Sequence, residues 1–88
     1  MKEKKGFGLR DIAGQKVIVA ESAENINFGK VIAMNNSSAY LWEALQGKEL
    51  DAQVMADLLT QKYEVEVEKA LADSQKLIEA WKNAGIIE

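Results

Sequence analysis

Apolar residues are grouped as in β-strands up to residue 34 and are spaced as in α-helices after it. The segment Lys16–Ala20, KVIVA, is apolar and β-branched and predicts the strongest strand of the chain. Gly14 predicts a turn just before it, so residues 8–20 are expected to form a hairpin. Residues 21–28 are mostly polar and predict a loop, and residues 30–34 predict a third strand.

The third predicted strand divides its side chains between two faces. Ile32 and Met34, with Phe28 in the same parity, share one face, and Val31 and Ala33 share the other. The pattern leaves two interpretations open for the second face, since Val31 and Ala33 either pack against other residues or stay exposed at the surface.

A first helix is predicted after this strand, with Glu43 and Gln46 facing outward. Either Asn35 or Asn36 is expected to cap it, because an asparagine side chain accepts hydrogen bonds from the first free N–H groups. Gly47 is expected to end it, since glycine tolerates a positive φ. The apolar face of this helix comprises Tyr40, Leu41, Trp42, Ala44 and Leu45.

Two further helices follow in the pattern. Asp51 is expected to cap one that runs from Ala52 to about Tyr63, and the last helix is expected to run from about Val67 to Ala84 and to stop at Gly85. The apolar stripe of the second helix comprises Val54, Met55, Leu58 and Leu59. The stripe of the last helix comprises Val67, Leu71, Ser74, Leu77, Ile78 and Trp81, and Ile86 and Ile87 are expected to fold back on the core.

Three strands followed by three helices predict an α+β fold, in which a small three-stranded antiparallel sheet precedes a three-helix, winged-helix-like bundle. The 88 residues predict a single domain, 1–88. Residues 1–7 are expected to be flexible. Trp42 and Trp81 both lie in apolar stripes, which favours the core for each, although Trp81 comes late in the last helix, where a groove could begin.

The composition excludes several classes of function. The chain has no Cys and no His, which removes thiolate metal sites, the commonest metal ligand and the commonest general base. The net charge is −3 and Arg10 is the one arginine, so a surface for nucleic-acid phosphates is not expected. With neither a signal peptide nor a run of roughly 20 apolar residues, a cytoplasmic protein is expected.

No group of acidic residues stands out as acid–base machinery. Glu64, Glu66 and Glu68 alternate in a polar stretch, and Glu21 and Glu24 share a loop, so solvated surface charge is favoured for all of them. The motifs GxGxxG, GxxxxGK[ST], HExxH and CxxC are absent. We therefore expect a protein that is not an enzyme and that holds no cofactor or metal.

A series of short motifs keeps a fixed order from about Leu9 to Ile87. V-I-x-M-N precedes a helix with A-x-L-W-x-x-L-x-G, a second helix ends L-L-x-x-x-Y, a third carries A-x-x-D-x-x-x-L-I, and the chain closes on A-G-I-I. This order resembles the PqqD-like family, small domains also called RiPP recognition elements. Two departures from that family are the missing proline near Ala20 and a serine, Ser74, where relatives usually have an aliphatic residue.

The resemblance implies a non-catalytic peptide-binding module. Such a module binds the leader segment of a ribosomally made precursor peptide and presents it to a modifying enzyme, often a radical S-adenosylmethionine enzyme. The leader would add as a strand beside the third strand, in a groove shared with the last helix. The matching strand residues are Lys30, Val31, Ile32, Ala33 and Met34, and the matching helix residues are Ala70, Asp73, Ser74, Leu77 and Trp81. For Asp73, a partly exposed helix charge without a binding role is the alternative.

Two other classes of function stay open. A DNA-binding winged helix would use the last helix for recognition, but residues 66–84 carry three lysines against four acidic residues. A structural subunit of a larger enzyme would have its apolar edge covered by that enzyme. The open edge of a small sheet could also pair with a second copy of the chain, so a homodimer is a further option.

Overall fold

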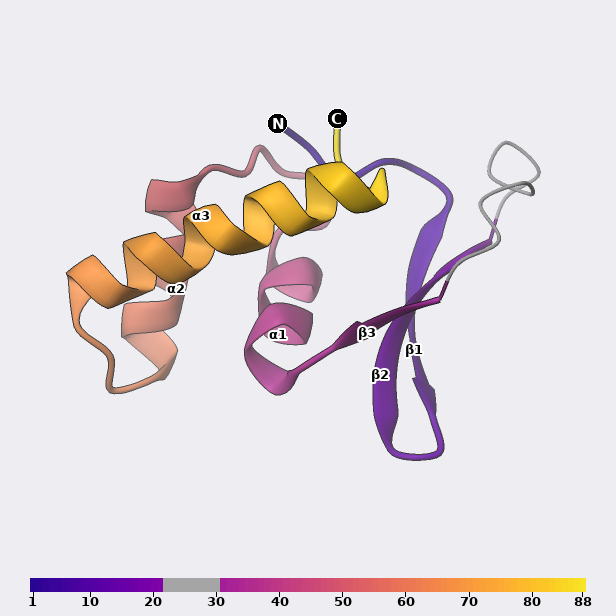
Figure 1. Ribbon diagram of the computed structural model, residues 1–88, viewed down its shortest axis with the longest axis horizontal. Coiled ribbons are helices and arrows are strands. Elements are labelled where there is room, and N and C mark those ends of the chain that lie inside the picture. Colours follow the sequence, from indigo (N-terminus) through magenta and orange to yellow (C-terminus); the bar gives the residue numbers. More distant parts are fainter. Residues whose placement is uncertain (22–30) are drawn as a thin grey trace.

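The computed structural model describes residues 1–21 and 31–88 of the chain. The strands form one antiparallel sheet in the order β1-β2-β3, and in Figure 1 α3 lies across α1 and α2 while the β1–β2 hairpin extends to one side. The predicted α+β fold is thus confirmed. Residues 22–28 of the predicted loop, and Lys30, lie outside the described residues. The elements are β1 (Phe7–Ile12), β2 (Gln15–Ala20), β3 (Ile32–Met34), α1 (Asn36–Ala44), α2 (Ala52–Lys62) and α3 (Val67–Ala84).

The predicted hairpin of β1 and β2 is present, and its loop consists of two residues, Ala13 and Gly14. Ala13 and Gly14 both have positive φ, 53° and 83°, and Ile12 pairs with Gln15. Two positive φ values in a two-residue loop match the right-handed twist of the strands. The Gly14 N–H also donates to Asp11 Oδ1 at 3.0 Å, which holds the turn.

Side-chain caps fix where two of the helices begin. Asn35, not Asn36, caps α1, and its Oδ1 accepts from the Ser38 N–H at 2.8 Å. Asp51 caps α2 as predicted, with its Oδ1 accepting from the Val54 N–H at 2.8 Å. Such a cap contributes about 1 kcal/mol, because it satisfies a backbone donor that the helix cannot.

The C-terminal ends of the helices were predicted with mixed success. The expectation that α1 runs up to Gly47 is wrong, because the helix ends at Ala44 and a turn follows in which Gly47 has a φ of 73°. This earlier end lets the chain turn so that Leu50 is buried in the core. Gly85 ends α3 as predicted, in the left-handed conformation at a φ of 79°.

The core lies between the sheet and the helices. Trp42 and Trp81 meet edge to face there, with ring centroids 5.4 Å apart, and both are almost fully buried. The prediction that both are core residues is therefore confirmed, and so is the folding back of Ile86 and Ile87, which join the same apolar cluster.

The predicted helix stripes are correct except at their margins. Met55 and Leu59 of α2 are buried as expected, whereas Val54 in the same stripe is 38% exposed. Val67 is 55% exposed, because it is the first residue of α3 and so lies at the end of that helix.

The two ends of the chain lie side by side and pair with each other (Figure 1). The Lys2 N–H donates to the Glu88 C=O at 2.8 Å, and the Glu88 N–H donates to the Lys2 C=O at 2.8 Å. The Lys4 N–H donates to the Ile86 C=O. Glu3 and Ile87 form an antiparallel bridge between these bonds. Residues 2–4 are therefore held by the C-terminal segment, in contrast to the flexible start that the sequence predicts.

Glu3 is expected to make the stability depend on pH. Its Oε2 is buried with no hydrogen-bond partner among the described residues, and burial raises the pKa of this carboxyl from 4.5 to about 8. The folded protein thus binds this proton more tightly than the unfolded chain does, so the free energy of unfolding decreases as pH rises from below 4.5 through about 8. Solvent screening of a half-buried group limits the loss to on the order of 2 kcal/mol.

Replacing Glu3 by glutamine removes the titrating proton and should flatten this dependence. Urea unfolding of the wild type and of Glu3→Gln, at about pH 5 and about pH 8, measures it. The variant should be the more stable of the two at the higher pH. An unchanged slope of stability against pH in Glu3→Gln would assign the dependence to another group.

Candidate functional site

The backbone of β3 alternates between a paired and an open edge. Within the hairpin, Ile12 pairs with Gln15 across the turn, and the Glu21 N–H donates to the Gly6 C=O at 2.6 Å. Backbone groups alternate in direction along an antiparallel pair, so the odd-numbered residues of β2 point their backbone N–H and C=O groups toward β1. Lys16 and Ile18 therefore point their backbone groups toward β3.

The partners of Lys16 and Ile18 on β3 are Met34 and Ile32, whose N–H and C=O groups accordingly face β2. The Met34 C=O confirms this direction, since it also accepts from Nε2 of Gln15, on β2, at 2.9 Å. The residues between and before them, Ala33 and Val31, must turn their backbone groups to the other side. They form the open edge of the sheet.

The side chains at this edge are separated as the sequence predicts. Met34 is buried in the core and Ile32 is partly buried against it, whereas Val31 is 64% exposed and Ala33 is exposed as well. This settles the two interpretations that the sequence left open, because Val31 and Ala33 lie at the surface. An added strand would meet free backbone groups and exposed apolar side chains here.

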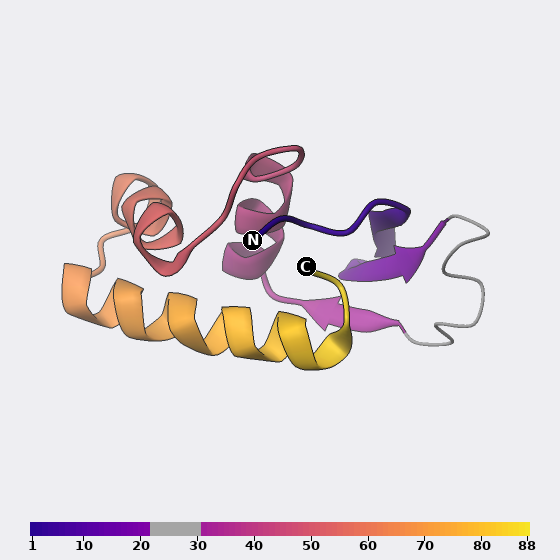
Figure 2. The same ribbon diagram turned by 90° about the horizontal axis from the view of Figure 1, so that it is seen from above.

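A hollow of about 440 Å³ continues this edge toward α3. Asn35 and Ser37, which directly follow β3, form one wall, and the apolar side chains of Leu77 and Ala80 on α3 belong to the other. In Figure 2, the free edge of β3 is the one nearer to the C-terminal half of α3. We call the open edge of β3 and this hollow together the groove.

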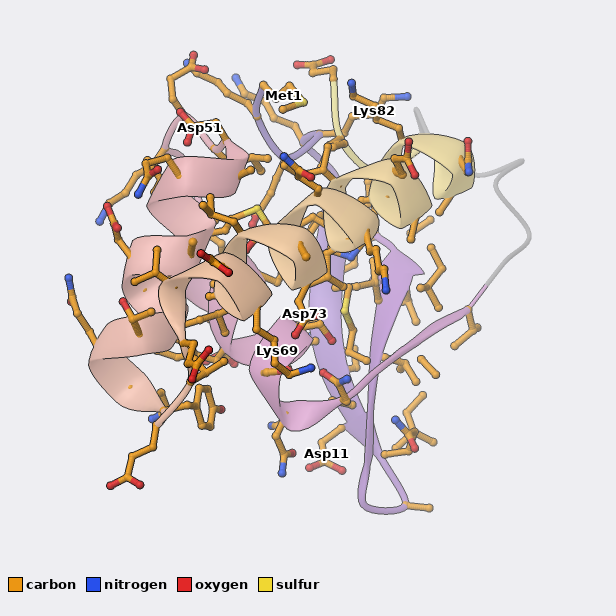
Figure 3. All side chains as sticks on the ribbon, turned by 60° about the vertical axis from the view of Figure 1, so that its left-hand side comes forward. Met1, Asp11, Asp51, Lys69, Asp73 and Lys82 are labelled. Atoms are coloured by element: carbon orange, nitrogen blue, oxygen red, sulfur yellow. The ribbon has the colours of Figure 1, made fainter. Side chains whose placement is uncertain are left out.

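Charged side chains flank the apolar part of the groove. Asp73 is 44% exposed and forms an ion pair of 3.7 Å with Lys69, one helical turn earlier. Both side chains project from the side of α3 that faces the start of α1 (Figure 3). Lys76 also lines the hollow and has no carboxylate within 4.0 Å among the described residues. Asp73 therefore borders the groove with its charge already balanced by Lys69.

Burial removes four of the residues that the resemblance placed in the groove. Met34, Ala70, Ser74 and Trp81 are all at most 4% exposed, so their side chains belong to the core and cannot touch a ligand at the surface. The helix residues are buried because α3 turns this stripe inward toward α1 and α2. The residues that the structure leaves at the groove are Val31, Ile32, Ala33, Asp73 and Leu77.

Four residues that line the hollow were not predicted from the sequence: Lys76 and Ala80 on α3, and Asn35 and Ser37 after β3. The first two carry a signal that was available, because residues 73, 76, 77 and 80 follow the i, i+3, i+4, i+7 spacing of a single helix face. Asn35 was expected only as a possible helix cap, Ser37 was not singled out, and nothing in their spacing marks them as groove residues.

Ser74 is expected to reduce stability where it stands. The residue is fully buried, and its Oγ has no hydrogen-bond partner among the described residues. An unpaired buried hydroxyl costs about 1–3 kcal/mol, and alanine is also the better helix former. Ser74→Ala should raise the free energy of unfolding by about 1 kcal/mol and the Tm by about 4–8 °C.

Thermal unfolding followed by circular dichroism measures this effect. Gln75→Ala is the matched control, because it makes a similar change at the neighbouring, exposed position of the same helix. A loss of stability in Ser74→Ala would mean that the hydroxyl has a partner that stabilises the fold.

One family has a sequence profile that fits this chain over most of its length. The profile is that of "Coenzyme PQQ synthesis protein D (PqqD)", and it matches residues 15–87, from the start of β2 to the C-terminal segment. The chain belongs to the PqqD family. The match includes both walls of the groove, while β1 precedes it. No curated protein and no solved structure matches the chain.

Membership of the PqqD family indicates a role in a biosynthetic pathway, since the family is named for the synthesis of coenzyme PQQ. Residues 1–21 and 31–88 hold no group of three or more acidic side chains that could bind a metal ion. No helix in the same ranges is long and apolar enough to cross a membrane.

Proposed function

We propose that this PqqD family member is a non-catalytic module that binds the leader segment of a ribosomally made precursor peptide. The leader would add to β3 as a fourth strand and be presented to a modifying enzyme, such as a radical S-adenosylmethionine enzyme, in the cytoplasm. The observation that carries this proposal is the open edge of Val31 and Ala33 beside the hollow against α3.

Backbone hydrogen bonds would supply much of the affinity. A strand added at a sheet edge pairs with the free N–H and C=O groups, and alternate side chains of the peptide then reach the neighbouring surface. At this edge those side chains would reach Leu77 and Ala80 on α3, which offer an apolar contact. Each buried methylene of the peptide would add about 0.8 kcal/mol there.

Nucleic-acid binding and catalysis have less support than peptide binding, from the charge of the chain and from its side-chain chemistry. Phosphate binding by α3 has little support, because Lys69 is paired with Asp73 and the chain as a whole carries a net charge of −3. The chain also contains no His or Cys that could act as a general base or nucleophile. A binding role that depends on backbone pairing needs neither a basic surface nor such residues.

Synthetic peptides test the proposal directly. They would cover the N-terminal halves of the short reading frames beside the gene of this protein, each with a scrambled version as control. Isothermal titration should give saturable binding of one peptide in the low micromolar range or tighter, and no binding of its scrambled version. Equal binding of both, or binding of duplex DNA in place of any peptide, would contradict the proposal.

The same edge could instead be occupied by a second copy of the chain. Analytical ultracentrifugation with and without the bound peptide separates the two uses. A dimer that dissociates as the peptide is added would place the dimer contact at β3. A monomer throughout would leave the edge free for the peptide.

A further inference from the structure

A second hollow, of about 350 Å³, lies at the start of α1. Asn36 lines it, whereas the residues on either side, Asn35 and Ser37, line the hollow of the groove. Consecutive helix residues point in directions about 100° apart, so the two hollows flank the first turn of α1. The second hollow thus lies across this turn from the groove.

Two tyrosines form an aromatic wall in the second hollow. The rings of Tyr40 and Tyr63 pack edge to face with centroids 6.3 Å apart, and Lys62 Nζ lies 4.8 Å from the centre of the Tyr40 ring. Both tyrosines are partly buried, so their rings are held in place. Tyrosine walls of this kind are frequent at binding surfaces, because a rigid ring offers a large contact area at a small entropic cost.

The second hollow also carries unpaired positive charge. Lys16 and Lys62 line it, and neither has a carboxylate within 4.0 Å in the part of the chain that the structure describes. Among the described residues, Glu43 is the one acidic residue of the lining, and it pairs with neither lysine. In a chain with a net charge of −3, a concave site with two ammonium groups that no carboxylate of the described residues pairs with complements a carboxylate of a ligand.

The direction of a bound strand decides which end of a peptide reaches this hollow. Neighbouring strands of the sheet are antiparallel, and an antiparallel addition would continue that pattern. Because β3 runs toward α1, the N-terminal end of an antiparallel peptide would lie at the start of α1. The residues of the peptide before its bound strand are then the ones that come nearest to Lys16 and Lys62.

We infer that the second hollow binds a carboxylate side chain in the N-terminal flank of the same peptide that adds to β3. This inference rests on the proposed function and extends it, since it assigns the chemistry of the flank. The protein then recognises the backbone and the apolar side chains of the peptide along β3. It recognises an aspartate or glutamate of the peptide at Tyr40, Tyr63 and the two lysines.

Two peptides and two double variants test the inference. The peptide that binds in the titration above is compared with a version in which each Asp and Glu of its N-terminal flank is changed to Asn or Gln. Lys16→Gln with Lys62→Gln should weaken binding of the acidic peptide about fivefold at low salt and leave the neutral peptide unchanged. The difference should shrink as salt is added, because mobile ions screen exposed charges.

Lys48→Gln with Lys82→Gln is the matched control, because it removes the same two charges from exposed positions that line neither hollow. It should leave both affinities within twofold of the wild type. Equal binding of the two peptides by the wild type, or a cognate leader without a carboxylate in that flank, would overturn the inference while leaving the strand site intact. If no peptide binds at all, the proposed function fails and this inference fails with it.

Discussion

Trp81→Ala is expected to destabilise the fold more than any other single change considered for this chain. The indole is 2% exposed and packs edge to face on Trp42, so its removal leaves a cavity and breaks an aromatic pair. Truncating a buried tryptophan costs about 3–5 kcal/mol. A chain of 88 residues has a total stability of about 4–13 kcal/mol at 0.05–0.15 kcal/mol per residue, so much of it would be lost.

Urea unfolding followed by far-ultraviolet circular dichroism measures this loss. Val67→Ala on the same helix is the control, since Val67 is 55% exposed and its truncation should change the stability by at most about 0.5 kcal/mol. Nearly wild-type stability of Trp81→Ala together with weakened peptide binding would contradict this expectation. It would show that Trp81 contacts the peptide in the groove, as the family resemblance implied.

Val31→Pro is expected to weaken peptide binding about tenfold while changing the stability by less than about 1 kcal/mol. Proline removes the N–H of Val31, the residue just before β3, and the alternation of β3, continued by one residue, turns this N–H to the open edge and away from β2. The Val31 side chain is 64% exposed, so its loss leaves no cavity in the core. Titration with the bound leader and urea unfolding measure the two effects separately.

Val31→Thr is the matched control for this variant. Threonine is β-branched and of similar shape, and it keeps the N–H, so binding should stay within twofold of the wild type. Equal loss of binding in both variants would assign the effect to the valine side chain. A loss of stability in Val31→Pro as large as its loss of binding would show that the N–H supports the fold instead of the ligand.

Local patterns in the sequence were sufficient to predict most of the fold. The β-branched run of β2, the glycine of the turn and the Asp51 cap each depend on neighbouring residues, which the sequence displays directly. The pairing of Lys2 with Glu88 was not predicted, because it joins opposite ends of the chain through backbone groups that carry no sequence signal. The early end of α1 was not predicted either, and the turn that follows it leads to Leu50, which is buried in the core.

The candidate site was predicted less completely than the fold. Strand alternation is enough to place Val31 and Ala33 on a face different from that of Met34, and the structure agrees. On α3, motif matching selected a helix that borders the hollow but did not distinguish its inner from its outer side. Ser74 and Trp81 turned inward, while Lys76, one turn from Asp73, was overlooked. The rotation of a helix about its axis is set by its packing partners, which no short motif describes.

Chemical-shift mapping tests the central claim of a peptide site between β3 and α3. Amide shifts of the ¹⁵N-labelled protein are recorded as the cognate leader is added. We expect the largest changes at Val31–Ala33 and along α3 from Asp73 to Ala80, with new protection from hydrogen exchange for the Val31 and Ala33 amides. Changes confined to residues 2–10, or spread over exposed lysines with both edge amides unprotected, would contradict the claim.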